Sequence, residues 1–96
     1  MNGIEAPTMY EARTAKKVYL YQNGSTYSRP KCMVVNDRQI RDFSTFLSRV
    51  TSGIRAPVAV RNIYTPHEGH RVVNLDDLQS GHYYVAGGSE NFKKIK

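Results

Sequence analysis

The sequence has a single cysteine, no long apolar run and few acidic residues over its first two thirds. Cys32 has no partner for an internal disulfide, so nothing indicates an oxidising compartment. No segment approaches the roughly 18 apolar residues of a membrane-spanning helix. The first residues also lack the apolar region of a secretory signal. We therefore expect a cytoplasmic protein that has no membrane partner.

The scarcity of acidic residues is local and leaves a strong charge asymmetry. Residues 13–61 hold ten Lys or Arg but only Asp37 and Asp42, so this stretch has a net charge of +8. The whole chain has a net charge of +6. Residues 62–90 hold Arg71 against four carboxylates, for −3, and the last six residues add three lysines. Such an uneven field raises encounter rates with a polyanion and aligns its approach. The alternative is that these cations only keep a small domain soluble.

Ninety-six residues are enough for one domain with one sheet and one helix around a single core. Residues 1–15 show neither a helical nor a strand period and are predicted to be a flexible leader. Residues 16–96 then form the domain, which we expect to be monomeric in isolation.

The first ordered feature is a hairpin. Residues 17–21 are a run rich in β-branched and aromatic side chains that would alternate between the two faces of a strand. Asn23-Gly24 follows directly after this run. A strand that runs into Asn-Gly indicates a hairpin. The return strand is predicted over residues 31–35, after Pro30.

The period then changes to that of an α-helix. Apolar residues fall on one helical stripe at Phe43, Phe46, Leu47, Val50 and Ile54. Asp42 stands where an N-cap is wanted, and Gly53 is predicted to be the left-handed residue that ends the helix.

The remaining chain predicts short elements. We expect a strand over residues 58–64, a turn over 65–69, a strand over 71–73, a helical turn over 75–78 and a last strand over 83–86. The order β-β-α-β-β-turn-β is that of an α+β fold of the ubiquitin-like β-grasp class, a mixed sheet of about five strands with one main helix packed across it.

Several patterns resemble chemistry but favour plainer interpretations. His67 and His70 lie in a Pro- and Gly-containing turn, with His82 as a possible third ligand, and loop histidines are the more common case. Cys32 has no activating partner in the sequence and is expected to pack as a small apolar residue. Asn23-Gly24-Ser25 fits a glycosylation pattern, but a turn is favoured in a chain without a signal peptide.

Four segments together resemble the doublecortin family. They are Lys16-Lys17-Val18 with Tyr21-Gln22-Asn23-Gly24, Val60-Arg61-Asn62-Ile63-Tyr64-Thr65, Leu75-Asp76-Asp77-Leu78 with Gly81-His82-Tyr83-Tyr84-Val85, and Asn91-Phe92-Lys93-Lys94-Ile95. They occur in the order and spacing of the family and span residues 16–96.

The resemblance implies a non-enzymatic module, without a cofactor, that binds tubulin and stabilises microtubules. The basic positions that match the family are Lys16, Lys17, Arg38, Arg41, Arg61, Lys93 and Lys94. Arg61 has an equal structural alternative, because a strand Arg often pairs with a carboxylate such as Asp42 or with a carbonyl.

The expected location is the cytoskeleton or a cilium. The alternative function is a ubiquitin-like scaffold module that binds signalling or ciliary proteins and has little affinity for tubulin. Nucleic acid is not the expected partner, although aromatic residues interleaved with Arg leave RNA as a third possibility.

Overall fold

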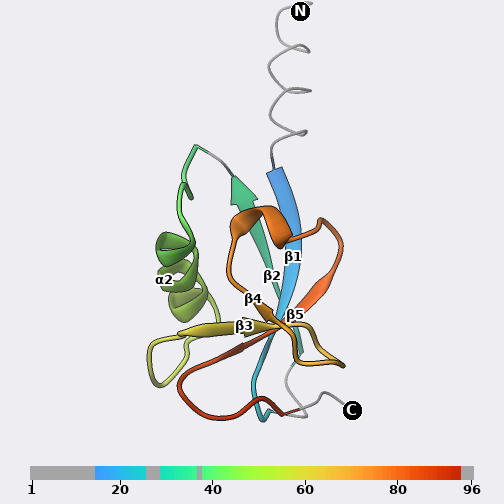
Figure 1. Cartoon of the computed structure of the whole chain (residues 1–96). Coiled ribbons are helices and arrows are strands. Elements are labelled where there is room, and N and C mark those ends of the chain that lie inside the picture. The colour runs from blue at the N-terminus through green and yellow to red at the C-terminus, as the bar shows by residue number, and fades with distance from the viewer. Residues whose placement is uncertain (1–14, 26–28, 37, 94–96) are drawn as a thin grey trace, which may run out of the picture.

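One five-stranded sheet with one α-helix across it forms the fold of this computed structural model, which describes residues 15–25, 29–36 and 38–93 (Figure 1). The elements in chain order are β1 (Ala15–Gln22), β2 (Lys31–Asn36), α2 (Phe43–Gly53), β3 (Asn62–Tyr64), β4 (Arg71–Val72), the 3-10 turn η1 (Leu75–Asp77) and β5 (Tyr83–Gly87). The predicted leader lies outside the described residues, apart from Ala15, which is the first residue of β1.

The sheet is mixed, with the strand order β2-β1-β5-β3-β4. β1 is antiparallel to β2 and parallel to β5. β3 is antiparallel to both β5 and β4. The predicted α+β class and its ubiquitin-like arrangement are therefore confirmed.

The alternation of side chains along β1 separates the two faces of the sheet. Val18 and Leu20 are buried on the inner face, under the helix. Tyr19 and Tyr21 lie on the opposite face, as predicted, and are only half-buried. The inner face thus provides the main hydrophobic core.

The helix packs its apolar stripe on this inner face. Phe46 and Val50 are fully buried, and Phe43, Leu47 and Ile54 pack around them. Asp42 is the N-cap, as predicted, and its Oδ1 accepts a 2.7 Å hydrogen bond from the Thr45 amide.

The end of the helix differs from the prediction. Gly53 is the last residue of α2, and the left-handed conformation (φ 54°) belongs to Arg55 instead. A Cβ on Gly53 would lie 2.8 Å from Cε of Met33 in β2. That atom is the end of a flexible side chain, so a larger residue at position 53 would require the Met33 methyl group to move.

The third strand is shorter than predicted. Only residues 62–64 join the sheet, and residues 58–61 are irregular. The amide of Val60 donates to Oγ1 of Thr51 in the helix (2.9 Å), which draws this segment away from the ladder. The Arg61 amide then donates to the Gly87 carbonyl (2.9 Å), where the strand is about to begin.

The outer face of the sheet is covered differently, by the segment that follows β5. The rings of Phe92 and Tyr64 pack with their centroids 5.2 Å apart, and Tyr64 is buried beneath this segment. In the part of the chain that the structure describes, no helix is long and apolar enough to span a membrane.

Candidate binding surfaces

Three basic residues gather around a hollow of about 320 Å3 at the hairpin-turn end of the sheet. We call Arg29, Lys31 and Arg55 the turn-end cluster. Arg29 and Lys31 lead into β2, opposite the end of β1, and Arg55 follows the helix. The residues lining the hollow include no carboxylate. The positive charge of this cluster is therefore not neutralised within the hollow.

The backbone after the helix explains how Arg55 comes to this position. The amides of Ile54 and Ala56 donate to the carbonyls of Val50 (2.9 Å) and Thr51 (3.1 Å). Arg55, between them, turns left-handed and keeps its side chain exposed. A cation just beyond a helix C-terminus is also favoured by the partial negative charge of that terminus.

Asn23 fixes the segment after β5 at the same end of the molecule. Its Nδ2 donates to Oε2 of Glu90 (3.0 Å) and to the Asn91 carbonyl (2.9 Å). Its Oδ1 accepts from the Lys93 amide (2.7 Å). The Asn-Gly pair thus makes the predicted turn, with Gly24 at φ 84°, and also clamps the chain 70 residues later.

Glu90 completes this clamp. Oε1 accepts from the Gly88 amide (3.1 Å) while Oε2 accepts from Asn23. The hydrogen bond from the Asn23 side chain, followed by those from backbone amides, lowers the pKa of the Glu90 carboxylate from its ordinary value. The carboxylate is thereby kept ionised beside Lys93.

A second group of cations, the strand-start cluster, lies where β1 begins and β2 ends. Its members are Lys16, Lys17, Arg38 and Arg41. Lys16 is half-buried, and its Nζ donates to the Leu75 carbonyl (3.0 Å), so its ammonium also holds η1 in place. Arg41 lines a hollow together with Asp42 and Asp76. Carboxylates therefore partly offset the charge of this cluster.

The structure divides the predicted site between the two ends of the sheet. Lys16 and Asn23 are seven residues apart along β1, which corresponds to roughly 23 Å. Lys93 lies at the turn end, where its Cδ would be 3.5 Å from a Cβ on Gly24. Arg61 is exposed beside the start of β3, and Lys94 lies outside the described residues.

Sequence reasoning missed the turn-end cluster. Arg29 and Lys31 are separated from Arg55 by the whole helix, so no local motif joins them. The topology contained the signal: β2 starts at the turn end, and a helix that runs back after β2 also ends there.

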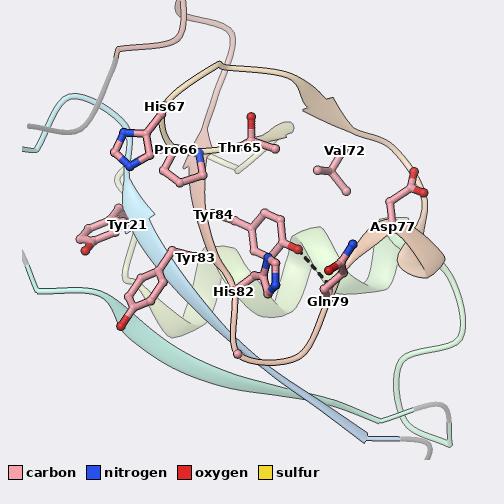
Figure 2. A pocket seen from close by; sticks show the side chains of 11 residues that line it. Tyr21, Thr65, Pro66, His67, Val72, Asp77, Gln79, His82, Tyr83 and Tyr84 are labelled. Carbon is pink, nitrogen blue, oxygen red and sulfur yellow. Dashed lines mark hydrogen bonds between the residues drawn. The ribbon is translucent and has the colours of Figure 1, made fainter.

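An aromatic row occupies the open part of the outer face. The rings of Tyr19 and Tyr83 stack with centroids 4.8 Å apart, and those of Tyr21 and Tyr83 lie 5.9 Å apart. Tyr83 remains 44% exposed. The row borders a groove of about 690 Å3 that passes Pro66 and reaches Asp77 (Figure 2).

The remaining candidates for chemistry take ordinary positions. His67 and His82 line the aromatic groove, whereas His70 pairs with Glu68 at 3.4 Å on the exposed turn. Within residues 15–25, 29–36 and 38–93, no three His, Cys, Asp or Glu side chains could hold a metal ion together. Cys32 is exposed on β2, contrary to its expected packing as a small apolar residue.

Comparisons with known proteins agree with this fold. The family model of doublecortin matches residues 34–92. The chain is 43% identical to doublecortin domain-containing protein 2 of Homo sapiens and 37% identical to doublecortin domain-containing protein 2C of Mus musculus, over 99% and 97% of its length. It is 31% identical to the serine/threonine-protein kinase DCLK1 of Mus musculus, over its whole length.

The chain spans about a fifth of the length of these relatives: 20% of the human protein, 27% of protein 2C and 15% of the kinase. The matched region is thus one module of longer proteins. The family model covers more than half of the chain, and its match includes the segments at residues 60–65 and 75–85 and most of the mixed sheet. The chain therefore belongs to the doublecortin family.

Proposed function

We propose that this domain binds tubulin and stabilises microtubules as a non-enzymatic cytoskeletal module. The family membership supports the partner, since the resemblance to doublecortin domains implies microtubule binding. The observation that carries the proposed site is the turn-end cluster, where Arg29, Lys31 and Arg55 share one hollow without a carboxylate. The surface of tubulin and its tails are acidic, so this hollow is complementary to them in charge.

The turn-end cluster is the stronger of the two basic surfaces. At the other end of the sheet, Arg41 shares its hollow with Asp42 and Asp76, and the ammonium of Lys16 is bound to a carbonyl. Lys93 lies at the same end, where Glu90 offsets part of its charge, and Arg61 is exposed beside the start of β3. The strand-start residues Lys17 and Arg38 then serve as long-range attraction rather than as the main contact.

Each exposed cation contributes only modestly, about 1 kcal/mol or less, and salt screens it. Affinity therefore comes from several cations that act on the same acidic surface. Binding should accordingly weaken steeply as ionic strength rises.

Co-sedimentation with taxol-stabilised microtubules at low and physiological salt tests this proposal. The turn-end variant carries Arg29→Gln, Lys31→Gln and Arg55→Asn, since Asn tolerates the left-handed backbone at position 55. The matched control carries Lys17→Gln, Arg38→Gln and Arg41→Gln, which removes the same charge from the other end.

We expect the turn-end variant to lose roughly 10- to 100-fold in affinity, because three contacts of that modest size are removed together. The control should lose much less. A larger loss in the control would place the site at the strand-start cluster. A folded domain that fails to pellet even at low salt would contradict microtubule binding and favour the scaffold alternative.

A further inference from the structure

The groove beside the tyrosine row is chemically opposite to the proposed tubulin surface. Its lining includes Asp77 but neither Lys nor Arg. Apart from Tyr21, its lining residues belong to residues 62–90, the stretch that carries −3. A second ligand, distinct from an acidic one, is therefore favoured here.

The aromatic end of the groove is built to hold a cation over ring faces. The stacked rings of Tyr21 and Tyr83 form one side, and Pro66 and His67 stand opposite them (Figure 2). Aromatic faces attract cations, and the planar guanidinium of Arg stacks on them better than the ammonium of Lys. At the other end of the groove, Asp77 can pair with a second cation.

The backbone beside the groove favours an extended peptide over a small molecule. The ladder between β3 and β5 stops at the pair Tyr64 and Val85, because the chain turns away at Thr65-Pro66. Within the described residues, Tyr83 and Tyr84 have a strand partner only on the β1 side. The peptide groups of Tyr84 point to β1, so Tyr83 alone can exchange backbone hydrogen bonds at the opposite edge, with one residue of an extended peptide.

We propose that this groove binds a short extended peptide segment that contains arginine. The segment lies beside Tyr83 of β5, one guanidinium stacks on the Tyr21 and Tyr83 rings, and a second approaches Asp77. The domain as a whole carries +6, so a cationic peptide has no general electrostatic reason to bind it. Binding by such a peptide would therefore report the local groove.

The test uses the 96-residue chain and a fluorescein-labelled peptide of sequence Gly-Thr-Arg-Val-Arg-Thr-Gly. Two comparison peptides carry citrulline or Glu in place of both Arg residues, and citrulline removes the charge while keeping the shape. Fluorescence anisotropy gives the affinities, and shifts of backbone amide NMR signals locate the site. We expect only the Arg peptide to bind, with shifts concentrated at residues 65–67 and 77–84.

Variants separate the groove from the rest of the surface. Tyr83→Ala and Asp77→Asn should each weaken binding of the Arg peptide by about threefold or more, the scale of a lost cation–π contact or ion pair. Asp76→Asn is the matched control, because Asp76 is the exposed neighbour that lines a different hollow. It should leave the affinity unchanged. Circular dichroism shows whether Tyr83→Ala is folded. If it is not, Asp77→Asn still tests the groove.

Several results would overturn the proposal. One is that the Arg peptide fails to bind, or that the citrulline or Glu peptide binds with equal affinity. Another is that Asp76→Asn and Asp77→Asn weaken binding of the Arg peptide equally. A third is that the NMR shifts are confined to the turn-end cluster. Microtubule co-sedimentation of Asp77→Asn should be no weaker than that of the wild type. This result keeps the peptide proposal distinguishable from the tubulin proposal.

Discussion

The two faces of the sheet are covered by different means. On the inner face, α2 buries Phe46 and Val50 completely among apolar strand residues. On the outer face, a segment without regular structure lies over Tyr64, fixed by Phe92 and by the side chain of Asn23. The inner layer therefore depends on apolar burial, whereas the outer layer depends on a few well-placed contacts.

This difference leaves part of the outer face open to partners. The clamp covers the end of the sheet near the hairpin turn, and the tyrosine row beyond it stays partly exposed. A helix across both faces would have buried that row. The domain can thus present a basic end and an aromatic groove without a second core.

The largest expected effect belongs to the inner face. Phe46→Ala removes a fully buried ring and should lower the free energy of unfolding by about 3–5 kcal/mol. Urea denaturation measures the change, and Ser48→Ala on the exposed side of the same helix is the control, which should be almost neutral. If Phe46→Ala lowered the free energy of unfolding no more than the outer-face variants do, the proposed difference between the two faces would be contradicted.

Gly69→Ala tests the apolar part of the outer face. Gly69 has φ 71°, and a Cβ there would lie 2.6 Å from Cδ2 of Phe92. Left-handed backbone alone costs Ala about 1–2 kcal/mol, and displacement of the ring adds to that. Gly81→Ala is a matched control, because Gly81 has φ 85° but no atom within 4 Å of the added Cβ. Equal losses in urea denaturation would show that the Phe92 contact contributes little.

Asn23→Ala tests the hydrogen bonds that hold the segment after β5 on the outer face. It removes two donated bonds and one accepted bond, all exposed, and should lower the free energy of unfolding by about 1–2 kcal/mol. Because the clamp is local, the Lys93 amide should exchange hydrogen much faster while the amides of Val18 and Phe46 exchange nearly as in the wild type. Gln22→Ala, at the end of β1 just before the turn, is the control. Uniformly faster exchange would mean that the two faces unfold together.

The sequence predicts those parts of the fold that depend on local periodicity. The hairpin, the helical stripe and the Asp42 cap follow from side-chain spacing, and the structure has them near the predicted positions. Glycine commonly ends helices, so the sequence predicts Gly53 as the left-handed residue, but Arg55 takes that conformation and Gly53 lies beside Cε of Met33 in β2. A close approach between distant segments leaves no local signature in the sequence.

The same limit applies to the candidate sites. The charge asymmetry and the family motifs indicate a basic surface, yet spacing alone cannot show that Lys16 and Lys93 lie at opposite ends of the sheet. Nor does spacing show that Arg29 and Arg55 share a hollow, or that Asn23 holds residues 90–93. These contacts depend on the packing of helix and sheet rather than on neighbouring residues.

The smallest expected effect returns to the inner layer, where Asp42 supplies a polar contact to the helix that Phe46 anchors. Asp42→Ala leaves the Thr45 amide without its acceptor and should lower the melting temperature slightly, less than Asn23→Ala does. The bond from the Thr45 amide lowers the pKa of the Asp42 carboxyl in the folded state. Its stabilisation is therefore complete above the unfolded pKa and lost as pH falls through the folded value.

The difference in melting temperature between wild type and Asp42→Ala should accordingly stay constant above about pH 5 and shrink as the pH falls below about 4. Asp42→Asn keeps an oxygen that accepts the bond but does not titrate, so its difference from Asp42→Ala should stay constant over the same range. If Asp42→Ala instead proved more harmful than Asn23→Ala, polar contacts would matter as much at the start of the helix as on the outer face. The contrast between the two layers would then rest on Phe46 alone.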